Sequence, residues 1–271
     1  LFIIYSLISI SLSIEIGDDI KMDLQLVKHQ PCLHTSGKSK WDRKIEFEGG
    51  NPSNGPKLEL IEGRSGCYSI GGKVNVLQEF SGNFSVYIEI RQTASIKAQP
   101  EKCSMQGADG CGGVGSCLYC DACSSFGSNI GVQAQLLLNG KSIQCSKGLR
   151  PGFYDDLKLL FCLPNIDDIL SSQGLSKETL MTLIQSEDGR SLRSLSLFAT
   201  VYIFDKDVRR QMIAQQRIEK IYREEHNKKS LFMDESLPSD VYWNMPFNSL
   251  IKKQIDYIGC HKIYGNIEVK S

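Results

Sequence analysis

Apolar and polar side chains alternate along several short segments of this chain. The clearest are residues 84–90, 132–138, 157–161 and 195–203, in which every second residue is apolar. Because successive side chains of a β-strand point to opposite faces, each segment predicts a strand with one buried face. Asn139-Gly140 follows the second segment and is typical of a tight hairpin turn. Several short strands bounded by turns predict a mostly β protein, an antiparallel β-sandwich or β-cup and not a parallel sheet.

Residues 207–225 follow the helical period instead. Apolar residues such as Val208, Met212 and Ile218 recur at helical spacing without an intervening Gly or Pro, and Asp205 or Asp207 can cap the start. The polar side is mainly basic, so this amphipathic helix either lies on an anionic membrane surface or, the commoner case, packs on the sheet with a solvated charged face. Shorter elements are predicted as strands at residues 44–47 and 258–269 and as a helical turn at residues 176–185.

The N-terminal residues have the character of a secretory leader. Leu1 to Leu12 form an apolar run interrupted only by serines and Tyr5, and Ser11-Leu12-Ser13 has the small-x-small pattern of a cleavage site. We expect residues 1–13 to be the remnant of a signal peptide, with a buried strand or a membrane anchor as the alternative. Residues 14–271 are then expected to form a single secreted domain with an insertion at about residues 206–256.

Ten cysteines in 271 residues favour an oxidising compartment. An even number allows complete pairing, so we expect disulfide bonds and a secreted, extracellular or lysosomal location. Asn83-Phe84-Ser85 would be a glycosylation site there, with the glycan on Asn83. The densest cysteine cluster contains five residues: Cys103, Cys111, Cys117, Cys120 and Cys123.

The cysteine cluster could in principle bind a metal, because Cys-x-x-Cys spacing occurs in zinc and iron–sulfur sites. The expected fourth ligand is missing, and no histidine is near in sequence. The glycines between Gly110 and Gly115 open into cysteines and not into a helix, so they do not form a dinucleotide loop. They are better explained by tight turns between crowded disulfides. We therefore predict no metal and no cofactor.

Motifs for catalysis and for nucleic-acid binding are missing from the sequence. It contains no Gly-x-Ser-x-Gly and no His-Glu-x-x-His motif. The paired carboxylates Asp167 and Asp168 follow Pro164-Asn165, a turn-rich setting in which Asp usually caps or solvates the chain. A formal net charge of zero provides no broad basic surface for nucleic acid. The sequence thus favours a binding protein over an enzyme.

Three motifs resemble the ganglioside-activator branch of the ML-domain lipid-recognition family. They are Gly72-Lys73-Val74-Asn75-Val76, the passage from Cys145-Ser146-Lys147-Gly148 to Gly152-Phe153-Tyr154, and the closing Gly259-Cys260-His261-Lys262-Ile263. The resemblance implies an immunoglobulin-like β-cup with an apolar cavity for acyl chains. It also implies that Cys32 and Cys260 join the ends of the domain, and that the central cysteines together with Cys145 form disulfides. Cys67, Cys162 and the insertion depart from the family pattern.

We accordingly expect a lipid-binding or lipid-transfer protein that holds an acyl chain or another apolar small molecule without catalysis. An ordinary solid sandwich core is the alternative for the residues expected to line its cavity: Phe84, Val86, Ile88, Ile90, Leu136, Leu138, Leu159, Phe161, Leu197 and Val201. A transient membrane contact is expected at Trp243 and Phe247, aided by Arg209 and Arg210 of the basic helix. The competing hypothesis is an extracellular adhesion or ligand module that binds a protein partner through the inserted helix.

Overall fold

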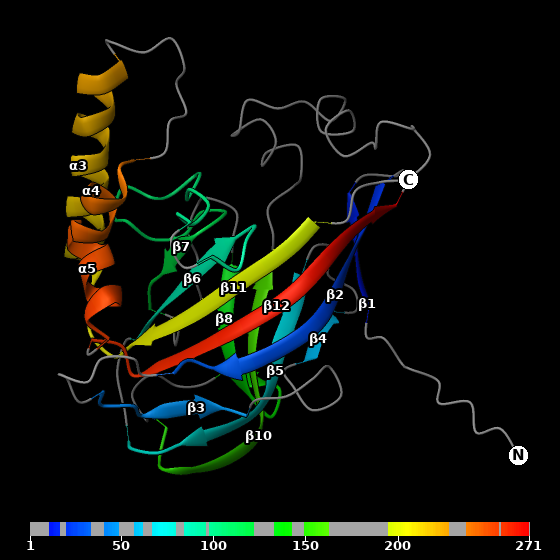
Figure 1. Cartoon of the computed structure of the whole chain (residues 1–271). Helices are drawn as coiled ribbons and strands as arrows, with labels where there is room; N and C mark the ends of the chain where they lie inside the picture. The colour runs from blue at the N-terminus through cyan, green and yellow to red at the C-terminus, as the bar shows by residue number, and fades with distance from the viewer. Residues whose placement is uncertain are drawn as a thin grey trace, which may run out of the picture.

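The computed structural model describes residues 11–16, 20–33, 41–48, 57–61, 67–79, 84–95, 98–121, 133–142, 149–162, 195–227, 237–254 and 256–270. These residues form two antiparallel β-sheets that face each other, with three helices at one side (Figure 1). The chain is therefore a disulfide-rich β-sandwich, as the alternating pattern predicts.

The first sheet has the strand order β1, β2, β12, β11, β6, β7. Its strands are β1 (Ser11–Ile16), β2 (Ile20–Pro31), β12 (Gly259–Lys270), β11 (Leu195–Phe204), β6 (Ser85–Arg91) and β7 (Cys117–Tyr119). The strands predicted at residues 84–90, 195–203 and 258–269 are confirmed. Of the expected signal peptide, residues 11–13 belong to β1, where Ser11 pairs with Gln25 of β2. Residues 1–10 lie outside the described residues.

The second sheet has the strand order β3, β5, β10, β8, β9, and β4 also pairs with β5. Its strands are β3 (Ile45–Phe47), β5 (Cys67–Val76), β10 (Gly152–Cys162), β8 (Gln133–Leu138), β9 (Lys141–Ser142) and β4 (Lys57–Leu60). Asn139 and Gly140 join β8 to β9 with φ angles of 51° and 71°. Two successive left-handed residues make the tight hairpin that their sequence predicts.

A hydrophobic core lies between the two sheets. Val74 and Val76 of β5 and Leu157 of β10 belong to the same buried cluster as Val86 of β6 and Ile203 of β11. Val74 and Val76 are two positions apart on β5, and Val86 and Ile203 are cross-strand partners. Each of these strands therefore turns one face toward the facing sheet. This cluster contains some of the aliphatic residues that the period-two pattern predicts to be buried, with Ile88, Leu138 and Val201 packed partly against it.

β6 is buried on both faces, whereas its alternating pattern predicts only one buried face. Val86 faces the inter-sheet core, but Tyr87 belongs to a separate cluster on the outer face of the first sheet. Glu89 and Arg91, on that same outer face, are only 4% and 9% exposed. The covering helices come from a segment more than a hundred residues further along the chain, which a local pattern cannot reveal.

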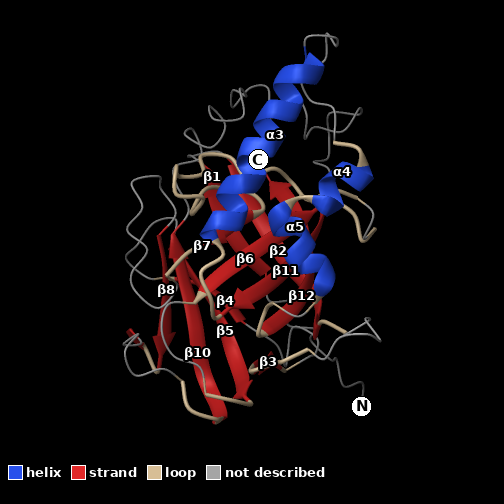
Figure 2. Cartoon of the chain, turned by 90° about the vertical axis from the view of Figure 1, so that its left-hand side faces the viewer, coloured by secondary structure: helices blue, strands red, loops and turns tan. Residues whose placement is uncertain are grey.

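The three described helices come between β11 and β12 in sequence and lie against one end of the outer face of the first sheet (Figure 2). They are α3 (Arg209–Asn227), α4 (Ser239–Asn244) and α5 (Pro246–Lys253). α3 is the predicted amphipathic helix, and Val208 and Met212 pack its base onto Phe204 of β11. Helices α4 and α5 were not predicted from the sequence, and the helical turn predicted at residues 176–185 lies outside the described residues. Among the described helices, none is both long and apolar enough to cross a membrane.

Three disulfides connect described cysteines. Cys32 and Cys260 are bonded across 228 residues with a Cα–Cα distance of 5.3 Å, as the family resemblance implied. Two more bonds join the central cysteines: Cys103 to Cys117 and Cys111 to Cys120. Cys67 is also disulfide-bonded, whereas Cys123 and Cys145 lie outside the described residues. These bonds indicate an oxidising compartment, and a bonded cysteine is no longer the thiolate that a metal site requires.

The glycines of the central cysteine cluster allow the chain to turn tightly between its two disulfides. Gly113 has a φ of 108°, and a Cβ atom added there would lie 2.5 Å from the backbone oxygen of Ser104. Gly115 has a φ of 104°, and its added Cβ would lie 2.2 Å from the backbone oxygen of Lys102. Only glycine fits both the backbone conformation and the close approach, which agrees with the role predicted from the sequence.

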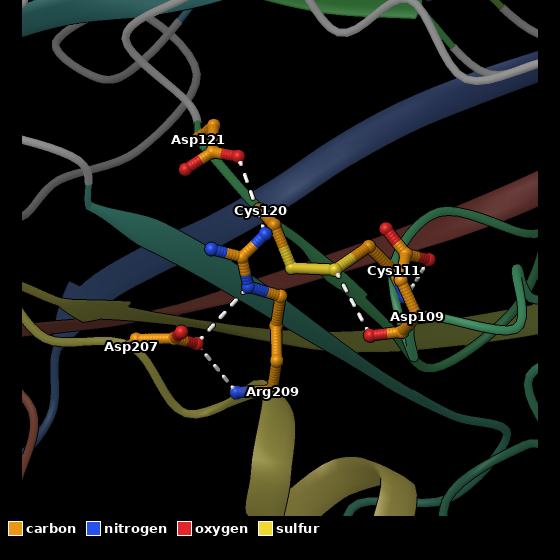
Figure 3. Close-up of polar contacts among 6 residues, drawn as sticks. All are labelled: Asp109, Cys111, Cys120, Asp121, Asp207 and Arg209. Atoms are coloured by element: carbon orange, nitrogen blue, oxygen red, sulfur yellow. Dashed lines mark hydrogen bonds and ion pairs between the residues drawn. A yellow bond between two sulfur atoms is a disulfide. The ribbon is translucent and has the colours of Figure 1, made fainter.

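Arg209 ties the base of α3 to this disulfide cluster (Figure 3). Asp207 accepts hydrogen bonds from the backbone N and from Nε of Arg209 at 2.9 and 3.1 Å, and the backbone bond lowers the pKa of Asp207. On the other side, Nη1 of Arg209 lies 3.6 Å from Oδ2 of Asp121, which directly follows Cys120. Asp207 thus caps the helix as predicted, and Arg209 bridges the helix to the cysteine-rich loop.

Candidate functional site

A cleft of about 1070 Å³ lies between the outer face of the first sheet and the inserted helices α4 and α5. Strands β6, β11 and β12 form its floor, and Trp243 of α4 and Ile251 of α5 are among the helical residues that line it. Its volume is at the upper end of the range typical of small-molecule sites. The cleft is therefore the candidate functional site.

The strand register places three polar residues in one row across the floor. Thr200 of β11 pairs with Glu89 of β6 on one side and with Lys262 of β12 on the other. Neighbouring strands are about 4.8 Å apart, so the row extends over roughly 10 Å. The floor of the cleft consequently offers hydroxyl, carboxylate and ammonium groups in a line.

Aromatic residues border this polar row on both sides. Phe198 of β11 and Tyr264 of β12 lie in the next row, with their ring centroids 5.6 Å apart. Tyr202 and Tyr257 lie on the opposite side, 5.1 Å apart, and all four residues line the cleft. Burial raises the pKa of Tyr257 to about 12, so its hydroxyl remains neutral at physiological pH. Beside the polar row, the cleft therefore presents apolar ring faces together with neutral hydrogen-bonding groups.

A buried ion pair forms one end of the floor. Nη2 of Arg91 lies 3.0 Å from Oε1 of Glu89. Nη1 of Arg91 donates a hydrogen bond of 3.0 Å to the backbone oxygen of Ser95, and its guanidinium carbon lies 5.6 Å from the ring centroid of Trp243. Burial raises the pKa of Glu89, although the neighbouring Arg91 acts in the opposite direction. The pair positions Trp243 of α4 over the sheet through a cation–π contact.

The structure corrects the expected membrane contact at Phe247. This side chain is 0% exposed, and its ring centroid lies 4.8 Å from that of Tyr87 on β6. α5 begins with Pro246 at its first turn and turns Phe247 and Ile251 toward the sheet. Phe247 thus holds the helices on the sheet and is not available to a membrane.

The other three residues expected at a membrane have different environments. Trp243 is partly buried and lines the cleft. Arg209 pairs with Asp207 and Asp121, while Arg210 is exposed on α3. The structure does not bring these residues together into one surface with Phe247.

Ten residues were expected to line a cavity between the sheets. The side chains of seven are described, and those of three are not. Phe84 and Val86 are buried in the inter-sheet cluster, and Ile88, Leu138 and Val201 pack partly against it. Ile90 and Leu197 are half-buried. The side chains of Leu136, Leu159 and Phe161 lie outside the described residues, as do Asn83, Asp167 and Asp168. None of the seven described wall candidates lines the cleft under the helices.

Two histidines that are distant in sequence meet in the structure. Nδ1 of His29 lies 2.8 Å from Nε2 of His261, and the two side chains are 1% and 3% exposed. Burial, and secondarily the neighbouring His29, lower the pKa of His261 to about 3. Phe47 of β3 packs edge-on against His261 at a centroid distance of 5.6 Å. The contact joins β2 to β12, and only the strand register could have predicted it.

A second, smaller cleft of about 590 Å³ lies between α3 and the cysteine-rich loop. Beneath it, Asn248 of α5 receives a hydrogen bond from Nε2 of Gln215 on α3 and donates its backbone N–H to the same amide. Nδ2 of Asn248 also donates to the backbone oxygen of Tyr242. These bonds satisfy the buried amides and fix the three helices to one another, which gives this region a structural role.

Within the described residues, no three His, Cys, Asp or Glu side chains form a group that could hold a metal ion. No protein-family model matches the chain, and no protein with a curated description is significantly similar to it. The chemistry of the cleft is therefore the basis for a functional argument. Aromatic walls over a polar floor suit the binding of a molecule that is apolar along its body and polar at one point.

Proposed function

We propose that this chain is a secreted, non-catalytic binding protein that shelters a lipid or a similarly apolar molecule in the cleft under α4 and α5. The observation that carries the proposal is the cleft of about 1070 Å³ with aromatic walls and a single polar row. Burial of an apolar ligand in this cleft would favour binding without any catalytic residue. Burial of each methylene is worth about 0.8 kcal/mol, so eight of them contribute roughly 6 kcal/mol before the costs of association.

Two considerations favour the cleft over the space between the sheets as the ligand site. Residues on the inner face, such as Val86 and Ile203, already contact one another in a packed cluster. The outer face instead leaves Phe198 and Tyr264 lining an open volume. A ligand can enter such a volume without displacing core side chains, whose packing is costly to disturb.

The experiment compares the two faces of a single strand. The chain is produced through a secretory host, and its bound molecules are measured by native mass spectrometry and by analysis of an organic extract. Thr200→Trp fills the cleft, and Leu197→Trp is the matched control because it introduces the same ring on the opposite face of β11. We expect Thr200→Trp to lower the bound lipid by about tenfold or more, and Leu197→Trp to leave it nearly unchanged.

The reverse result would move the ligand to the space between the sheets. Wild-type protein that carries no lipid, and takes up none from vesicles, would contradict the binding function itself. Near-ultraviolet circular dichroism and disulfide mapping check that each variant is folded, so that a loss of ligand is not confused with a loss of structure.

The exposed side of α3 supports a second candidate, a module that binds a protein partner. Ile218 and Ile221 are 41% and 48% exposed on this helix, and Arg217 beside them is also exposed. Neighbouring exposed apolar residues often mark an interaction surface. Ile218→Glu combined with Ile221→Glu should abolish partner capture if this candidate is right, and should leave lipid content unchanged if the cleft is the functional site.

A further inference from the structure

Lys262 is a charged residue of the cleft floor that shares its counter-charge, the carboxylate of Glu89, with Arg91. It is partly buried on β12 and lines the cleft next to Thr200 in the polar row. Within the described residues it makes no direct ion pair, whereas Glu89 at the end of the row is held 3.0 Å from Arg91. One carboxylate thus serves two cations, so the floor can accept a further negative charge.

The charged residues that line the cleft have a net charge of +1. The three cations are Arg91, Lys252 and Lys262, and the two anions are Glu89 and Asp240. Asp240 and Lys252 are exposed on α4 and α5, where solvent screens them. The unbalanced charge therefore belongs to the floor and not to the rim.

A second donor on the same floor also lacks an acceptor. Nε of Arg91 is buried, and within the described part of the chain it has no hydrogen-bond partner. Buried polar atoms are nearly always satisfied, so an exception needs an explanation. Arg91 thus adds an unsatisfied donor to the positive charge at this end of the floor.

Resting on the proposed binding function, we infer that the ligand is a long-chain monocarboxylate whose carboxylate group pairs with Lys262. The aromatic rows of Phe198 and Tyr202 on either side of Lys262 suit an apolar chain that leaves this point. A single negative charge neutralises the floor. A dianion would introduce a charge that meets the carboxylate of Glu89 in the same row, which is unfavourable.

The test uses three probes with the oxidised full-length chain: oleate, oleyl alcohol and acetate. Isothermal titration calorimetry is performed below the micelle concentration of each amphiphile. We expect wild-type protein to bind oleate about tenfold or more tightly than oleyl alcohol, because a charge-assisted hydrogen bond distinguishes them. Acetate should bind weakly, because it lacks the apolar chain.

Variants identify the residue that makes this distinction. Lys262→Met keeps the length of the side chain and removes its charge, so the preference for oleate should disappear while oleyl alcohol binds as before. Lys262→Arg should retain the preference. Lys73→Met is the matched control, because Lys73 is exposed on β5 of the second sheet and does not line the cleft, and it should behave as wild type. Should Lys262→Met prove unfolded by circular dichroism, Lys262→Gln replaces it.

The outcomes separate this inference from the function on which it rests. Equal affinity for oleate and oleyl alcohol in wild type, or an unchanged preference in Lys262→Met, overturns the assignment of a carboxylate and leaves lipid binding standing. Acetate that binds as tightly as oleate overturns the long-chain ligand in favour of a simple anion site. Binding of none of the probes contradicts the proposed function as well.

Discussion

Strand β6 of the first sheet is buried on both faces, but the two faces are built from different chemistry. On the inner face, β6 presents Val86 and Ile88 to the facing sheet. On the outer face, the same strand presents Tyr87, Glu89 and Arg91 to the helices. An aliphatic face can be filled by many residues of suitable volume, whereas a buried polar face requires particular partners. Burial alone therefore does not locate a candidate site, whereas buried polar groups help to locate one.

The largest effect should come from breaking the ion pair of the outer face. Arg91→Met leaves the carboxylate of Glu89 buried without its partner, which should cost about 3 kcal/mol or more of unfolding free energy at neutral pH. The double variant Glu89→Leu with Arg91→Met should recover most of that loss, because no charge remains unpaired. Urea denaturation measures both variants. Losses that simply add would show that the two side chains act independently.

A fall in pH should change the free energy of unfolding in opposite directions through the titratable groups of the two faces. The folded-state pKa of His261 on the inner face is about 3, below its ordinary value of 6.5. The unfolded chain therefore binds the proton first, and stability is lost as pH falls from about 6.5 toward 3. The folded-state pKa of Glu89 on the outer face is raised above its ordinary value of 4.5. Its contribution therefore increases as pH falls from the raised value toward 4.5.

Variants of each face test this contrast through the slope of unfolding free energy against pH. Replacing the pair with His29→Leu and His261→Phe should flatten the loss of stability between pH 6.5 and 3, which we expect to be a few kcal/mol. Glu89→Gln should change the slope just above pH 4.5 in the opposite sense, because the folded-state pKa of Glu89 is raised above that value. An unchanged slope in the histidine variant would show that other groups cause the acid sensitivity.

The smallest effect is expected where the aliphatic face is altered conservatively. Ile203→Val removes one methylene from the inter-sheet core and should cost about 1 kcal/mol, and Ile203→Leu should cost less than about 1.5 kcal/mol after repacking. Neither should change ligand affinity, because Ile203 faces away from the cleft. A large loss of binding in either variant would mean that the two faces are mechanically coupled.

Local patterns in the sequence predicted strands β3, β6, β8, β10, β11 and β12, the hairpin at Asn139-Gly140 and helix α3, because each depends on neighbours within a few residues. Strands β1, β2, β4 and β7 were not predicted. The signals of α5 were also present, since Pro246 suits a first helical turn and Phe247, Leu250 and Ile251 follow at helical spacing.

The candidate site could not be predicted in the same way. The row formed by Glu89, Thr200 and Lys262 exists only after three strands from distant parts of the chain are aligned. The contact between His29 and His261 spans 232 residues and depends on the same alignment. A shift of one residue in strand register would turn these side chains to the other face. The site is thus a property of the sheet and not of any single segment.

The Cys32–Cys260 bond has a consequence for how the molecule survives in a compartment that contains proteases. Its two half-cystines are separated by 228 residues and hold β2 beside β12. A single backbone cut anywhere between them leaves both fragments covalently attached. Nicked molecules should therefore migrate as one species on a non-reducing gel and separate only after reduction, with the cleft floor still assembled until the cross-link is opened.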